Sequence, residues 1–96
     1  MEFVQIVEFR TSDIEALRAR GRAYEQEMGD DRAGAAMVCA DRDNPGRYFI
    51  IGRFSSYDDA MRNSDDPRTQ ALAGDMAKLT EGPPTFYNLD LIEEIG

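Results

Sequence analysis

The chain has 96 residues, 42% of them hydrophobic and only four of them proline, so we expect one folded domain over residues 1–96. Eleven basic against nineteen acidic residues give a net charge of −8, which repels phosphate backbones and anionic membrane surfaces, and neither nucleic acid nor membrane is an expected partner. With no histidine and a single cysteine, the sequence excludes an internal disulfide, the usual zinc ligand sets and a histidine-bound haem.

The first predicted strand covers residues 3–9, FVQIVEF, in which both alternating faces are largely apolar. The N-terminus begins with an acid and alternates, whereas a signal peptide presents a basic end followed by an apolar stretch. No apolar run in the chain is long enough to cross a bilayer. We therefore expect a cytoplasmic protein.

A helix is predicted over about residues 13–28. Ser12 and Glu15 have the spacing of a capping box, and Gly29 provides a C-terminal stop. Side chains at helical intervals define the stripe that we expect to face the core: Ile14, Leu17, Gly21, Tyr24 and Met28.

Two strands joined by a tight turn come next. Residues 33–41, AGAAMVCAD, form the weaker strand, because alanine and glycine are poor strand formers. Residues 47–54, RYFIIGRF, form the strongest strand in the chain. Between them Asn44, Pro45 and Gly46 supply the backbone angles of a reversal, so we predict a β-hairpin.

A broken helix precedes the last strand, which covers residues 85–92. Ser56 caps a short helix over residues 56–63, and Asp66 with Pro67 marks a second start shortly afterwards. The paired acids in this region stand at helix starts, where they complement the helix dipole, so we interpret them as capping residues and not as a magnesium site.

The resulting order, β-α-β-β-α-β, predicts an α+β fold of the ferredoxin-like split βαβ type. Two right-handed crossovers place the first and third strands in the centre of a four-stranded antiparallel sheet, with the second and fourth at its edges. Both helices then cover one face, and the other face is left open.

The open face is expected to be apolar whether the odd-numbered or the even-numbered residues of the central strands lie on it. With the odd positions open, it would carry Val7, Phe9, Phe49 and Ile51. Burying each of these side chains stabilises a fold by roughly 1.5–3 kcal/mol. If all four stay exposed to water, on the order of 10 kcal/mol of stabilisation is lost. We therefore expect a homodimer in which two sheets pack face to face.

The order of elements, the broken second helix and the run FSSYDDAMRNSDDPRTQALAGDMAKLTEGPPTFYNLDLI (54–92) resemble the antibiotic biosynthesis monooxygenase-like family of the dimeric α+β-barrel superfamily. The resemblance implies two ferredoxin-like subunits packed into a barrel, each with a small pocket between sheet and helices. The implied activity is oxygenation of an aromatic polyketide without metal or flavin. In that chemistry the substrate carbanion reduces dioxygen, and the protein supplies positioning, an apolar cavity and hydrogen bonds to an oxyanion.

In such a site Asn88 would donate to the developing oxyanion, and Arg53 would stabilise charge. The residues expected to contact substrate are Gln5, Phe49, Phe86 and Asp90. Structural roles are left open for both catalytic candidates: Asn88 would cap a strand edge or lie at a solvated rim, and Arg53 would pair across strands with Glu8 or Asp90.

The chain departs from some oxygenases of this type in having neither tryptophan nor histidine. Related enzymes that degrade haem hold iron through histidine, so that branch is disfavoured as well. Proton transfer would fall to a tyrosine, or to a carboxylate whose pKa is raised by burial. The residues considered for it are Asp90, Glu8, Tyr48, Tyr24 and Tyr87.

The sulfur-containing side chains are interpreted as packing. Cys39 lies in a strand of small residues with no histidine to lower its pKa, which favours a core thiol. Met28, Met37, Met61 and Met76 fall at positions expected in the core.

The last strand, TFYNLDLI, alternates between two rows of side chains. We predict that Tyr87, Leu89 and Leu91 pack under the helices, and that Phe86, Asn88 and Asp90 turn toward the inner face of the dimer. Two functions follow. One is a cofactor-free monooxygenase acting on a small hydrophobic, aromatic or polyketide-like carbonyl compound. The other is a non-catalytic dimeric module that binds a small hydrophobic ligand or associates with another protein.

Overall fold

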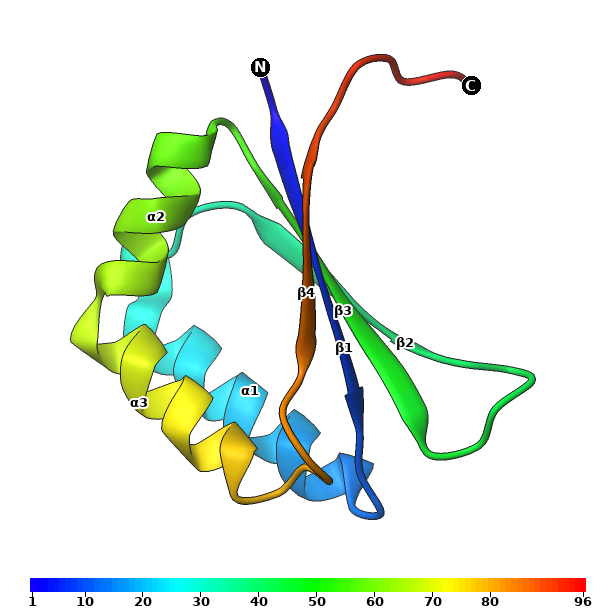
Figure 1. Cartoon of the computed structure of the whole chain (residues 1–96). Helices are drawn as coiled ribbons and strands as arrows, with labels where there is room; N and C mark the ends of the chain where they lie inside the picture. The colour runs from blue at the N-terminus through cyan, green and yellow to red at the C-terminus, as the bar shows by residue number, and fades with distance from the viewer.

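The structure, a computed structural model, describes all residues from 1 to 96. A four-stranded antiparallel sheet carries all of the helices on one face, as Figure 1 shows. In chain order the elements are β1 (Phe3–Arg10), α1 (Ile14–Met28), the short 3₁₀ helix η1 (Gly29–Asp31), β2 (Ala35–Ala40), β3 (Arg47–Phe54), α2 (Tyr57–Asp65), α3 (Pro67–Ala77) and β4 (Thr85–Asp90). None of the helices combines the length and the apolar character that crossing a membrane requires.

The strands lie side by side in the order β2-β3-β1-β4, and every neighbouring pair is antiparallel. This confirms the predicted split βαβ fold, with the first and third strands in the centre. The predicted broken helix is also confirmed, since α2 and α3 are separate helices that meet at Asp66. In Figure 1 both chain termini lie at the same end of the sheet.

The helix ends follow the predicted signals, with one correction. Ser56 and Asp66 cap α2 and α3, and Gly29 ends α1 with a φ of 53°. The cap of α1, however, is Asp13 and not Ser12, because the Asp13 carboxylate accepts the Ala16 N–H at 3.1 Å. The buried hydroxyl of Thr11 accepts the Asp13 N–H at 3.0 Å, which holds the entry turn one residue further along than expected.

The predicted distribution of residues between the two faces of the sheet is wrong in one respect. Val7 and Phe9 were expected beside Phe49 and Ile51, but β1 pairs with β3 in a register that joins Glu8 to Phe49 and Val7 to Ile50. Directly paired side chains lie on the same face. Val7 and Phe9 therefore lie under the helices, and Phe9 is only 4% exposed. Phe49 and Ile51 lie on the open face.

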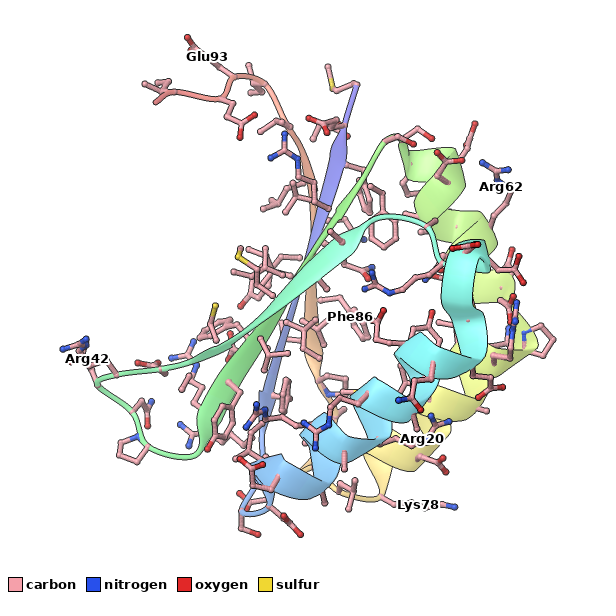
Figure 2. All side chains as sticks on the ribbon, turned by 180° about the vertical axis from the view of Figure 1, so that it is seen from behind. Arg20, Arg42, Arg62, Lys78, Phe86 and Glu93 are labelled. Carbon is pink, nitrogen blue, oxygen red and sulfur yellow. The ribbon has the colours of Figure 1, made fainter.

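The same reasoning reverses the prediction for β4. Its register joins Val7 to Phe86, Gln5 to Asn88 and Phe3 to Asp90. The row of Phe86, Asn88 and Asp90 therefore shares the face of the helices, and Tyr87 and Leu89 lie on the open face. Figure 2 shows Phe86 on the side of the sheet that faces the helices. Alternation along a strand separates its side chains into two rows. Which row lies on which face of the sheet depends on the pairing register with the neighbouring strand, and alternation alone does not reveal that register.

The fully buried core is small. Its apolar members are Phe3, Phe9, Leu17, Tyr24, Met28 and Ala60. Met37 was expected in the core, but it is 60% exposed on the open face, and Cys39 is only half-buried on that face. Few side chains are completely enclosed because the space between helices and sheet is partly hollow.

Candidate functional site

Two adjoining cavities lie between the sheet and the helices α1 and α3. Their volumes are about 350 Å³ and about 230 Å³, so the larger one falls within the usual size range of small-molecule sites. Both are lined by Phe9, Tyr24, Arg32, Ala36, Ile50, Leu72 and Met76. The shared walls make them two compartments of one hollow.

Small residues create this space. Gly21 occupies the middle of the core-facing stripe of α1, and a Cβ added there would meet no atom within 4 Å. Ala36 on β2 lies across the hollow, and Gly52 on β3 lines the smaller compartment. The stripe predicted from helical spacing is therefore real, but its glycine position contributes a void and not a contact.

A cluster of three polar side chains lines the smaller compartment. The Tyr24 hydroxyl lies 2.7 Å from the Thr69 hydroxyl and accepts a hydrogen bond from Asn63 Nδ2 at 3.3 Å. These residues come from α1, α2 and α3, and all three belong to the wall of this compartment. Tyr24 is only 5% exposed. The cluster places hydroxyl and amide groups beside a largely apolar space.

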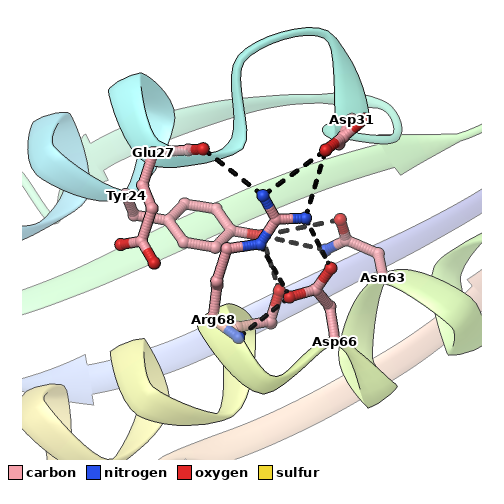
Figure 3. A network of polar contacts seen from close by, with 7 residues as sticks. Tyr24, Glu27, Asp31, Asn63, Asp66 and Arg68 are labelled. Carbon is pink, nitrogen blue, oxygen red and sulfur yellow. Dashed lines mark hydrogen bonds and ion pairs between the residues drawn. The ribbon is translucent and has the colours of Figure 1, made fainter.

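The joint between α2 and α3 is held by an ion-pair network, shown in Figure 3. The Arg68 guanidinium binds the Asp66 carboxylate at 2.8 Å and the Asp31 carboxylate at 3.4 Å, and it donates to the Glu27 carbonyl oxygen at 3.4 Å. Hydrogen bonding to Arg68 lowers the pKa of Asp66 to about 2. Because Asn63 and Thr69 flank this joint, the network fixes their positions relative to α1.

A second polar pair lies on the sheet side of the hollow. Gln5 Nε2 on β1 donates to Asn88 Oδ1 on β4 at 3.1 Å. Gln5 and Phe86 both line the smaller compartment, whereas Asn88 lies beside Gln5 on the exposed edge strand. The structure thus brings together three of the residues singled out from the sequence. Asp90 continues the row, opposite Phe3 at the end of β4, and is exposed.

Arg53 and Phe49 do not join this group, because both lie on the open face. Arg53 binds Glu2 at 2.8 Å and Glu94 at 2.9 Å. The prediction that it pairs with Glu8 or Asp90 is therefore wrong. Hydrogen bonds to Glu94 and then to Glu2 raise the pKa of Arg53 further above its ordinary value. These contacts hold the C-terminal segment against the start of β1.

Glu8 also belongs to the open face. The Arg47 guanidinium lies 3.0 Å from its carboxylate and 5.1 Å from the centre of the Phe49 ring, and the Tyr87 hydroxyl donates to Glu8 at 3.0 Å. Hydrogen bonds from Arg47 and then Tyr87 lower the pKa of Glu8. A raised pKa was considered for the carboxylate that would transfer the proton. At Glu8 this expectation is wrong, because the neighbouring groups donate hydrogen bonds that stabilise the charged form.

Asn63 and Thr69 were not predicted from the sequence as site residues. Neither stands in a recognisable motif, and they lie on two different helices separated by the Asp66–Pro67 break. Tyr24 was considered for proton transfer, and its place beside the other two became visible only with the packing of α1 on α3.

No protein-family model and no curated protein matches this chain. Its fold, however, is that of solved structures described as antibiotic biosynthesis monooxygenases. A candidate antibiotic biosynthesis monooxygenase from Nitrosomonas europaea has a TM-score of 0.81 at 14% identity, over 99% of this chain and 94% of that one. A second, from Caulobacter crescentus, has a TM-score of 0.82 at 12% identity, over 96% and 91%.

A mutant of SnoaB, a cofactor-independent oxygenase from Streptomyces nogalater, is also similar. Its TM-score is 0.77 at 15% identity, over 98% of this chain and 96% of that chain. At such identities the likeness concerns the fold. The fold resemblance predicted from residues 54–92 and from the order of elements is confirmed.

Proposed function

We propose that the protein is a cofactor-independent monooxygenase for a small hydrophobic, aromatic or polyketide-like carbonyl compound. The observation that carries the proposal is the apolar hollow between sheet and helices, with Tyr24, Asn63 and Thr69 clustered on its wall. The fold shared with a cofactor-independent oxygenase supports it. The absence of a membrane-spanning helix and the acidic surface are compatible with the cytoplasmic location that we also propose.

The chemistry is carried by the substrate. A methylene group activated by an adjacent carbonyl loses a proton to water, the resulting carbanion adds to dioxygen, and the peroxide so formed takes up a proton before it loses water. One oxygen atom becomes a new carbonyl oxygen and the other leaves as water. The two electron pairs that reduce dioxygen both come from the two C–H bonds of the methylene group. The protein has to stabilise the enolate oxygen and to exclude bulk water.

In this proposal the enolate oxygen accepts hydrogen bonds from the Tyr24 and Asn63 cluster. Thr69 orients the Tyr24 hydroxyl, since the two oxygen atoms are 2.7 Å apart. Gln5 contacts the substrate from the sheet side, and Asn88 orients Gln5 through their hydrogen bond. Phe86 forms an aromatic wall. Arg53 and Phe49 take no part, because they lie on the other face of the sheet.

We further propose that the protein is a homodimer joined through the open sheet faces. The chain exposes 6529 Å² of surface, whereas a folded monomer of its mass exposes about 5,500 Å². The excess of about 1,000 Å² is close to the share that one subunit contributes to a standard interface. The open face carries Ile6, Ile51, Tyr87, Leu89 and Met37, which gives the interface an apolar centre.

A non-catalytic ligand-binding dimer is the second candidate. It is favoured by one observation: the only carboxylate on the walls of the hollow is Glu25, and it is already engaged by Arg32 at 2.8 Å. No free carboxylate is therefore in place to accept the substrate proton.

Oxygen consumption with an anthrone separates the two candidates. The wild-type protein is expected to consume oxygen faster than the uncatalysed oxidation of anthrone, and Asn63→Ala is expected to lower that rate at least tenfold, as the loss of an oxyanion donor does elsewhere. Asn44→Ala, in the β2–β3 turn, is the matched control and should keep the rate. Asn88→Ala should have a smaller effect than Asn63→Ala. Binding of anthrone without any acceleration would support the non-catalytic candidate.

A further inference from the structure

The wall of the larger compartment is basic, although the protein as a whole is acidic. Three arginines line it, Arg18, Arg22 and Arg32, and Glu25 is its only acidic residue. The whole chain carries eleven basic and nineteen acidic residues. The balance of charge at this wall is therefore the reverse of the balance over the molecule.

These arginines are only partly neutralised. Arg18 pairs with Glu15 at 3.0 Å, in an exposed contact within one turn of α1. Arg22, one turn further along, forms none of the ion pairs of the structure and faces Arg18 as a like charge. Like charges four residues apart on a helix repel one another. An anion placed between them would remove that repulsion.

Arg32 supplies a third donor from the loop between η1 and β2. Its Nη1 donates to the Gly34 carbonyl oxygen at 3.0 Å. Its Nε pairs with a Glu25 carboxylate oxygen at 2.8 Å, so the charge of Arg32 is neutralised in part. A guanidinium group carries five N–H donors, so donors remain for a ligand oxygen beside these two contacts. Arg32 lines both compartments, so it lies where the ligand body and its charged group would meet.

The rest of the larger compartment is apolar. Phe9, Ile14, Leu17, Ile50 and Leu72 form its inner wall, and Gly21 leaves room beside them. A site with an apolar interior and only partly neutralised guanidinium groups on one wall suits an amphipathic molecule. Its hydrophobic body fills the hollow, and its anionic group binds arginine, which is the side chain best suited to carboxylates.

We propose that the hollow binds a hydrophobic, aromatic carboxylate, whose charged group is held by Arg22 and Arg32. This proposal rests on the proposed function in assuming that the hollow is the substrate site, and it narrows the substrate class from hydrophobic carbonyl compounds in general to those that also carry a carboxylate. Binding of the charged group is independent of the oxygenation step, because the ligand binds before the reaction takes place.

The test compares two fluorescent probes of similar shape, the anionic anilinonaphthalene sulfonate and the neutral N-phenylnaphthylamine. Arg22→Gln removes the charge at the wall, and Arg42→Gln removes another exposed charge at the tip of the β2–β3 hairpin, which Figure 2 shows far from the helices. Gly21→Leu fills the larger compartment, and Gly74→Leu adds the same side chain at an open position of α3 that lines neither compartment.

Arg22→Gln is expected to weaken sulfonate binding roughly fivefold, as befits a partly exposed charge-assisted contact, and to leave binding of the neutral probe unchanged. Gly21→Leu should weaken both probes. Neither Arg42→Gln nor Gly74→Leu should weaken either of them. Added salt should weaken only the sulfonate, and a naphthoate should displace it from the wild-type protein.

The proposal is overturned if Arg22→Gln and Arg42→Gln have equal effects, since the arginine would then act only through net charge. It is also overturned if Gly21→Leu leaves sulfonate binding intact, because the probe would then lie outside the hollow. Failure of the proposed function gives a different result: the probes bind as described, and the wild-type protein does not accelerate oxygen consumption.

Discussion

The hydroxyl oxygens of Tyr24 and Thr69 lie 2.7 Å apart and join α1 to the first turn of α3. Tyr24→Phe removes this contact and leaves Thr69 without its partner. We expect the free energy of unfolding to fall by about 1–2 kcal/mol, together with a loss of the proposed oxygenase activity, as measured by urea titration and oxygen uptake. Tyr57→Phe is the control, because Tyr57 is half-exposed and contacts Phe3 through its ring, which the change retains. Equal effects of the two changes would argue against the cluster.

Gly21 and Gly34 should respond in opposite ways to alanine. Gly21 is helical and a Cβ there meets nothing, so Gly21→Ala should raise the free energy of unfolding by up to about 1 kcal/mol. Gly74→Ala, at an equally open helical position, should give a similar gain. Gly34 has a φ of +77°, and a Cβ there would collide with the Arg53 carbonyl oxygen, so Gly34→Ala should destabilise. A loss at Gly21 comparable to that at Gly34 would show that α1 is closely packed there.

The Asp66–Arg68 pair predicts a defined dependence of stability on pH. Arg68 lowers the pKa of Asp66 from 3.8 to about 2 in the folded protein, so the stabilisation is present above 3.8 and is lost as the pH falls toward 2. Asp66→Asn keeps a good helix cap but abolishes the charge. We expect the variant to have the lower Tm at neutral pH, and the difference from wild type to shrink between these two pH values.

Thermal unfolding followed by circular dichroism measures this difference. The other carboxylates with lowered pKa values, such as Glu8 and Asp75, titrate in both proteins and cancel in the comparison. A difference in Tm that stays constant down to about pH 2 would mean that the ion pair contributes nothing.

Dimerisation through the open face can be tested at Leu89. This side chain is 45% exposed on β4 and belongs to the apolar face that we propose as the interface. Wild-type protein should sediment as a dimer at micromolar concentration, and Leu89→Glu should sediment as a folded monomer, because burying an unpaired carboxylate is costly. Ile95→Glu, at an 87% exposed residue outside the sheet, should still be dimeric. A monomeric wild-type protein contradicts the proposal.

Most of the fold was accessible from local patterns. The period of two in FVQIVEF and RYFIIGRF, the caps at Ser56 and Asp66 and the stop at Gly29 are set by neighbouring residues, and the structure confirms all of them. The strand order followed from the handedness of the crossovers. The exception is the start of α1, where the contact between Thr11 and the distant Leu79 carbonyl oxygen accompanies a cap at Asp13.

The candidate site was accessible only in part. Gln5, Asn88 and Phe86 were recognised as a polar and aromatic group, but the face on which they lie was assigned wrongly. Asn63 and Thr69 were not recognised at all. Both errors concern long-range geometry: a shift of one residue in register moves a whole row of side chains to the other face, and the side chains of three helices meet only after those helices have packed.

By itself, then, the amino-acid sequence determined the elements, their order and the α+β class, because helix caps, turns and apolar periods act over a few residues. Only the tertiary structure decided that Arg53 stabilises the C-terminal segment through Glu2 and Glu94, that Asn88 supports Gln5, and that Gly21 borders a cavity. The physical reason is that register and helix packing join residues far apart in the chain, and no local preference encodes which of them will meet.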